Sequence, residues 1–179
     1  PSTAKFITRK LARHFVADAP PPALVARLEQ DFRRTGGDLA SLARVLIQSG
    51  EAWTVPQVKL RKPYEFLIAS LRATGEKSDR VPAMLNALNM MGQPLWNPPG
   101  PNGHPDDEAS LMAPKAIKTR LEFAVQVARQ VGNRIDPREL ADHLYGAALS
   151  QDTKQAIARA ETKPQGLALL LMSTEFQRR

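Results

Sequence analysis

PKAIKTRLEFAVQVARQV, residues 114–131, is the stretch that decides the fold. Pro114 suits the first turn of a helix, and Gly132 with Asn133 suits its end. Between them, apolar residues recur at three- and four-residue spacing, which places them on one helical face. These residues are Ile117, Leu121, Ala124, Val125 and Ala128. The pattern predicts a long amphipathic helix.

Similar helix signals run along the rest of the chain in both directions. Prolines that suit a first helical turn stand at Pro22, Pro63, Pro137 and Pro164. Side chains that can cap a helix stand at Asp38, Asp136 and Ser150, with Ser78 or Asp79 as a further choice. No run alternates apolar and polar residues with β-branched enrichment. The sequence therefore predicts an all-α fold, an irregular helical bundle of about eight or nine helices with one long Pro/Gly-rich loop.

The chain length fits a single helical domain over residues 1–179. Possible sub-bundles cover residues 1–90 and 109–179, joined by the loop 91–108. The sequence starts at Pro1, without an initiator Met and with a helical pattern already running. We therefore expect it to be the C-terminal portion of a longer protein.

The joining loop, MGQPLWNPPGPNGHPDD at residues 91–107, is the candidate functional surface. Its glycines permit backbone conformations closed to other residues, and its prolines stiffen the path. Gln93, Asn97 and Asn102 supply amide groups and Trp96 supplies a flat apolar face, a set that suits a sugar or a peptide. The alternative is that Trp96 and Leu95 anchor the loop to the helices.

Acidic residues and a histidine gather at the end of this loop, as His104, Asp106, Asp107 and Glu108. A hydrolase could use His104 and Asp106 together with groups from a segment upstream of Pro1. The other interpretation makes Asp106 and Asp107 caps of the following helix. Their spacing matches no metal motif, and Cys is absent from the chain. We therefore predict no metal site and no cofactor, and whether the chain is an enzyme stays open.

The chain carries a net charge of +7, with the excess in its N-terminal half. Lys5, Arg9 and Arg13 recur at helical spacing, and a second basic cluster consists of Lys59, Arg61 and Lys62. Nucleic acid or an anionic surface could bind there if both clusters shared one face. A solvated helix face is the favoured explanation of the first cluster, because apolar residues lie about opposite to it. They are Ala4, Ile7, Leu11 and Phe15.

Aromatic residues for base stacking are not interleaved with these cations, so nucleic acid is an unlikely partner. A protein, peptide or carbohydrate at the loop 91–108 is the partner that the composition favours. No apolar run approaches the length of a transmembrane helix. The compartment cannot be derived from these residues alone.

Two segments far apart in the chain share one pattern. The first is Leu42-x-x-x-Leu46 followed by Ser49-x-Glu51-x-Trp53, and the second is Leu167-x-x-x-Leu171 followed by Ser173-x-Glu175-Phe176. Each pattern indicates a helix that ends in a Ser-x-Glu turn. If the repeat is structural, Trp53 and Phe176 are both predicted to plug the core.

Several motifs together resemble the C-terminal part of a large uncharacterised bacterial family, domain of unknown function 1800. They are Arg9-Lys10-Leu11-x-x-His14-Phe15, Pro21-x-x-Leu24 through Phe32, Gly37-Asp38-Leu39 to Ser49, Gly92-Gln93-Pro94-Leu95-Trp96, and Pro98-Pro99-x-Pro101-Asn102-Gly103-x-Pro105-Asp106. The resemblance runs over nearly the whole chain. It implies a bacterial protein that is exported to the periplasm or secreted, and it carries no reaction, cofactor or catalytic residue to transfer.

Overall fold

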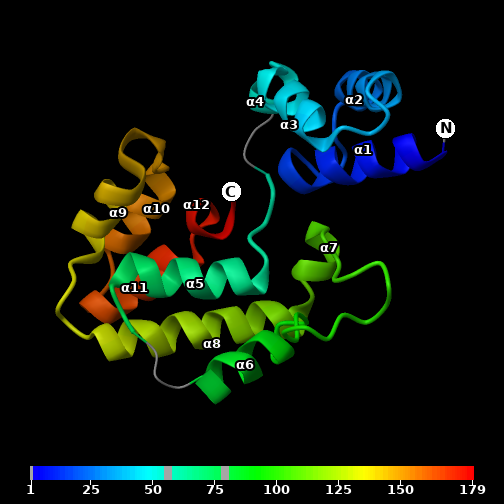
Figure 1. Cartoon of the computed structure of the whole chain (residues 1–179). Coiled ribbons are helices and arrows are strands. Elements are labelled where there is room, and N and C mark those ends of the chain that lie inside the picture. Colours follow the sequence, from blue (N-terminus) through cyan, green and yellow to red (C-terminus); the bar gives the residue numbers. More distant parts are fainter. Residues whose placement is uncertain (1, 55–57, 78–80) are drawn as a thin grey trace. The chain divides into compact units, whose positions relative to one another are not determined.

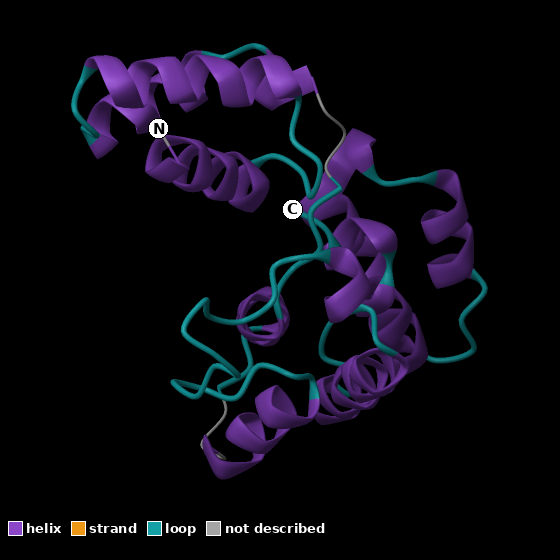
Figure 2. Ribbon diagram, turned by 90° about the vertical axis from the view of Figure 1, so that its right-hand side faces the viewer, coloured by secondary structure: helices purple, strands orange, loops and turns teal. Residues whose placement is uncertain are grey.

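The protein is all-α, as the sequence predicts. The structure, a computed structural model, describes residues 2–54, 58–77 and 81–179, and these contain twelve α-helices, one 3₁₀ helix and no strand beyond an isolated bridge (Figures 1 and 2). Nine of the described α-helices span eight residues or more. The chain divides into two compact units, Pro1–Lys59 and Leu60–Arg179, called unit 1 and unit 2 below.

Unit 1 is a group of helices in which the second packs against both the first and the third. The helices are α1 (Ser2–Phe15), α2 (Pro22–Arg34), α3 (Leu39–Gln48) and the short α4 (Glu51–Thr54). Pro22 opens α2 as predicted, and the Asp38 side chain accepts from the Ala40 backbone N–H to cap α3. The core is built mainly from Ala12, Leu24, Leu28, Leu42 and Leu46.

The buried face of α1 differs from the predicted one. Ala4, Thr8 and Ala12 are buried, whereas Phe15 is exposed. The small side chains of this face let α1 approach α2 closely, and the Thr8 hydroxyl is satisfied because it donates to the Ala4 carbonyl at 2.8 Å. The large apolar residues of α1 therefore lie at the margin of its interface.

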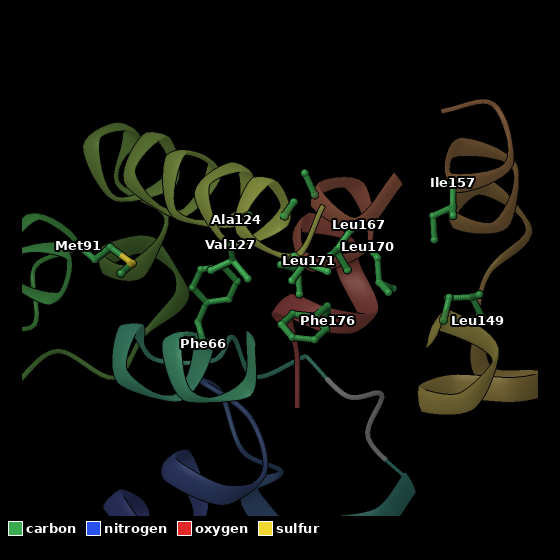
Figure 3. Packing of buried hydrophobic residues seen from close by; sticks show 14 residues of the cluster. Phe66, Met91, Ala124, Val127, Leu149, Ile157, Leu167, Leu170, Leu171 and Phe176 are labelled. Atoms are coloured by element: carbon green, nitrogen blue, oxygen red, sulfur yellow. The ribbon is translucent and has the colours of Figure 1, made fainter. Parts of the chain in front are cut away.

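Unit 2 contains the remaining helices, of which α8 and α11 form the central pair. The α-helices are α5 (Pro63–Thr74), α6 (Val81–Met90), α7 (Glu108–Leu111), α8 (Pro114–Val131), α9 (Pro137–Tyr145), α10 (Gln151–Ala158), α11 (Lys163–Met172) and α12 (Thr174–Gln177), and Gly146–Ala148 forms the 3₁₀ helix. Helices α5 and α6 pack on α8, while α9 and α10 pack on α11. Figure 3 shows Phe66 of α5 and Phe176 of α12 in the core beside α8 and α11.

The predicted helix starts in unit 2 are largely confirmed. Pro63, Pro114 and Pro137 lie in the first turns of their helices, and Asp136 and Ser150 cap α9 and α10 with their side chains. Helix α11 begins one residue before Pro164, because the Thr162 side chain caps it by accepting from the Gln165 N–H. The proposed cap at Ser78 or Asp79 lies outside the described residues.

Helix α8 buries a charged residue where the periodicity predicts a leucine. Arg120 is only 1% exposed, whereas Leu121, expected on the buried face, is 48% exposed. The Arg120 guanidinium donates to Gln177 Oε1 at 2.8 Å and to the Arg61 carbonyl at 2.7 Å, and it lies over the Phe66 ring. Burial lowers the pKa of Arg120 to about 10, with Glu65 opposing the shift. These contacts compensate the desolvation of the cation.

The first and last segments of unit 2 are joined by backbone contacts. The Arg61 N–H donates to the Gln177 carbonyl at 2.7 Å, and Leu60 pairs with Arg178 in an antiparallel bridge. The boundary between the units accordingly lies at residues 59 and 60 and not at the loop 91–108. Helices α5 and α6 before that loop pack on α8 after it, so the loop is internal to unit 2.

The repeated Ser-x-Glu pattern produces the same local structure twice. Ser49 ends α3 before α4, and Ser173 ends α11 before α12. The prediction for the aromatics is correct for Phe176, which is 2% exposed, and wrong for Trp53, which is 72% exposed. In unit 1 the indole lies outside the core because its Nε1–H is bonded to the Ile47 carbonyl, at the end of α3, at 2.7 Å.

Candidate functional site

The loop after α6 begins with backbone conformations that only some residues accept. Gly92 has φ 84° and Gly103 has φ 85°, both in the left-handed region where glycine is unstrained. The Gln93 N–H donates to the Leu88 carbonyl at 2.9 Å, and its side-chain Oε1 accepts from the Tyr64 N–H of α5 at 3.0 Å. The loop is therefore attached to two helices of unit 2 at its first residues.

Trp96 is the most unusual residue of the loop. It has φ 58°, the only left-handed non-glycine residue in the described part of the chain, and its side chain is 92% exposed. A bulky residue in this conformation is strained, and such strain occurs more often at binding sites than elsewhere. The interpretation that Trp96 and Leu95 anchor the loop is wrong, since Leu95 is also exposed.

A cavity of about 600 Å³ lies between this loop and helices α5 and α6. Most of its lining is apolar, and it comprises Tyr64, Leu88, Gln93, Pro94, Leu95, Trp96, Pro98, Gly103 and His104. Within the described residues, His104 Nδ1 is shielded from solvent and has no hydrogen-bond partner. The cavity thus combines an apolar wall with the polar side chains of Gln93 and His104.

The structure brings only part of the predicted site together. Gln93, Trp96 and His104 line the cavity, whereas Asn97 and Asn102 are exposed and do not line it. Among the acids, Asp106 pairs with Lys62 at 3.4 Å between Oδ1 and Nζ. Asp107 caps α7, and its Oδ1 accepts from the Ser110 N–H and hydroxyl, each at 2.9 Å.

These contacts give the two aspartates structural roles, so a catalytic pair with His104 has little support from the geometry. Asp107 acts as the cap of the following helix, as one interpretation of the sequence predicts. In residues 2–54, 58–77 and 81–179, no group of three or more acidic or histidine side chains could hold a metal ion.

The second basic cluster does not form a solvent-facing patch. Lys59 is 2% exposed and pairs with Asp18 at 2.6 Å. Arg61 donates to the Phe176 carbonyl at 2.8 Å, and Lys62 faces Asp106. These cations hold the fold together locally, which removes the continuous basic face that nucleic-acid binding would require.

A second cavity of unit 2, which sequence reasoning missed, runs along α5 and measures about 620 Å³. Most of its lining comes from one face of α5, and the end of α9 and Phe176 of α12 complete it. The lining residues are Arg61, Tyr64, Glu65, Ile68, Ala69, Arg72, Ala73, Leu144, Tyr145 and Phe176. The four-residue spacing of Tyr64, Ile68 and Arg72 along α5 was the available signal. It did not reveal that α9 stops short of covering this face.

A third cavity belongs to unit 1 and is smaller, about 250 Å³. It is lined by side chains of α1, α3 and α4, nearly all apolar, namely Leu11, Phe15, Val16, Ala43, Leu46, Ile47, Ala52 and Trp53. The exposed rings of Phe15 and Trp53 are therefore parts of one hollow and not isolated surface residues.

The fold and these cavities define the chain as an all-α protein of two helical units, each of which contains at least one cavity. It belongs to the family described as "Protein of unknown function (DUF1800)", whose model matches residues 1–178. Comparisons with curated proteins and with solved structures give no match. No helix among the described residues is long and apolar enough to span a membrane.

Proposed function

We propose that the chain is a helical binding module whose loop 91–108 presents Trp96 and the adjoining cavity to a partner. The observation that carries this proposal is the exposure of Trp96, 92%, in a left-handed backbone conformation. Burial of an indole on binding contributes strongly to the free energy of binding, and aromatic residues dominate the energetics of many interfaces.

The lining of the loop cavity favours a peptide over a carbohydrate. Pro94, Leu95 and Pro98 supply apolar walls beside Trp96, and few polar side chains point into the space. Sugars need several hydrogen-bond partners, whereas an apolar or proline side chain of a peptide needs only the walls and one or two polar contacts. Tyr64, Gln93 and His104 are the polar residues of this lining, few enough to suit such a peptide.

Two other functions have weaker support. A hydrolase that uses His104 and Asp106 would have to break the contact of Asp106 with Lys62. Binding of nucleic acid would depend on the first basic cluster, Lys5, Arg9 and Arg13 of α1, since the side chains of the second basic cluster bind within the protein. Neither alternative uses the exposed indole.

Selection from a random peptide display library with the full 179-residue chain tests the proposal, with a glycan array in parallel. We expect enriched peptides with apolar or proline residues, and Trp96→Ala should weaken their binding at least about tenfold. Trp53→Ala is the matched control, because it removes the other tryptophan, also exposed, and should leave the affinity unchanged. Enrichment that survives Trp96→Ala, no enrichment, or binding to glycans alone would contradict it.

A further inference from the structure

The cleft along α5 has a shape suited to a small elongated molecule. Residues of three successive turns of α5 line it, and Ala69 and Ala73 leave room because their side chains are short. Leu144 and Tyr145 of α9 form one wall, and Phe176 of α12 closes the base. Its volume of about 620 Å³ lies in the range of small-molecule sites.

The residues that line the cleft carry a net positive charge. Arg61 and Arg72 both line it, and for neither is an ion pair with a carboxylate found among the described residues. Glu65 is the only acid in the lining, and its carboxylate is already bound by Arg179 at 3.0 Å and by the Lys62 N–H at 2.9 Å. An anion entering the cleft would meet a net positive charge.

The Arg61 end is better ordered than the Arg72 end. Arg61 Nη1 donates to the Phe176 carbonyl at 2.8 Å, and the guanidinium carbon lies 5.2 Å from the centre of the Phe176 ring. The half-buried Tyr145 hydroxyl interacts with the same guanidinium. Arg72 is exposed and lies in the last turn of α5, about 14 Å along the helix from Pro63 at its start, by the helical rise of about 1.5 Å per residue.

We propose that this cleft binds an organic monocarboxylate with an apolar chain or ring. The carboxylate would accept hydrogen bonds from Arg61 and the Tyr145 hydroxyl, since a guanidinium held in place forms strong bonds to carboxylates. The apolar part would lie on Ala69 and Ala73. A single negative charge fits better than a dianion such as a phosphate ester, because Glu65 lies in the same lining.

Calorimetric titration of the full chain with octanoate and with 3-phenylpropionate tests the proposal, with the primary amide of each acid as an uncharged control. We expect each acid to bind at least about tenfold more tightly than its amide, because only the acid forms the charged hydrogen bonds. The affinity of the acid should also fall with rising salt. Equal binding of acid and amide, or no binding of either acid, would overturn the proposal.

Variants locate the binding on the chain. Ala69→Leu fills the cleft and should abolish binding of octanoate, whereas Ala43→Leu fills the apolar cavity of unit 1 and should leave it unchanged. Tyr145→Phe removes one hydroxyl and should weaken octanoate severalfold without affecting its amide. It gives an independent answer should Ala69→Leu fail to fold. Loss of octanoate binding in Ala43→Leu would contradict this location of the site. Unchanged binding in Tyr145→Phe and in a folded Ala69→Leu variant would contradict it as well.

Discussion

The ends of α3 in unit 1 and of α11 in unit 2 share a local structure and differ in what surrounds it. Ser49 and Ser173 both have extended backbone and both precede a four-residue helix. The aromatic that follows is 72% exposed as Trp53 and 2% exposed as Phe176. Two segments of similar pattern, of five and four residues, thus form the same kind of turn, but one leaves its aromatic ring exposed and the other buries it.

The difference follows from what packs over each turn. Phe176 lies against Phe66, and Arg61 covers its ring while the Gln177 side chain is held by Arg120. Trp53 has no such cover within unit 1, and its Nε1–H is bonded back to α3. The turn is therefore local in origin, whereas the burial of the aromatic depends on residues far away in the chain.

Exchanging each aromatic for alanine tests this contrast most directly, and we expect the largest effect here. Phe176→Ala should lower the free energy of unfolding by about 3–5 kcal/mol, because it leaves a cavity in the core. Trp53→Ala should cost less than about 1 kcal/mol, because the ring is largely in solvent. Urea denaturation followed by circular dichroism measures both. Similar losses for the two variants would show that exposure does not distinguish the rings.

Arg120→Met tests whether distant contacts hold the second turn in place. The variant keeps an apolar stem and removes two charged hydrogen bonds, leaving Gln177 Oε1 and the Arg61 carbonyl without this donor. We expect a loss of about 2–3 kcal/mol in the free energy of unfolding. Leu121→Met is the control on the neighbouring, half-exposed position and should be nearly neutral. A neutral Arg120→Met would mean that packing alone keeps the C-terminal turn in place.

The acids of the two turns give a smaller, pH-dependent contrast. Burial favours the neutral form of Glu175, but hydrogen bonds from Ser150 and Thr153 outweigh this and lower its pKa from 4.5 to about 2. Its contribution is complete above about pH 4.5 and is lost as the pH falls towards 2, because protonation ends those bonds. We expect this carboxylate to contribute about 1 kcal/mol to the free energy of unfolding at neutral pH, after allowance for solvent screening.

Glu51 is the counterpart, and its hydrogen bond with the more exposed Arg27 also lowers its pKa. The melting temperature should therefore depend less on pH, between pH 7 and pH 2, in Glu175→Gln than in Glu51→Gln. A weaker pH dependence in Glu51→Gln would contradict this prediction, because it would make Glu51 the acid that contributes more to stability.

Much of the helix layout was predictable because its signals are local. Asp38, Asp136 and Ser150 cap the helices that their positions indicate, and Pro63 and Pro114 open theirs. A cap or a first-turn proline acts within about four residues, so sequence alone contains the cause. The short helices α4, α7 and α12 have too few residues for a periodic signal.

The residues placed wrongly depend on tertiary contacts. Periodicity assigns Leu121 to the core, but Arg120 is buried there because Gln177 and Arg61 complete its hydrogen bonds. The loop was identifiable from its glycines and prolines, while the exposure of Trp96 was one of two interpretations. The α5 cleft could not be predicted, since its walls come from α9 and α12.

The pairing of Leu60 with Arg178 brings the two ends of unit 2 to one point. A polypeptide whose ends meet can be cut open in a surface loop and rejoined through a short linker without moving its helices. Unit 2 is therefore suited to circular permutation, and a new opening in the loop 91–108 would convert its exposed indole segment into a pair of chain ends.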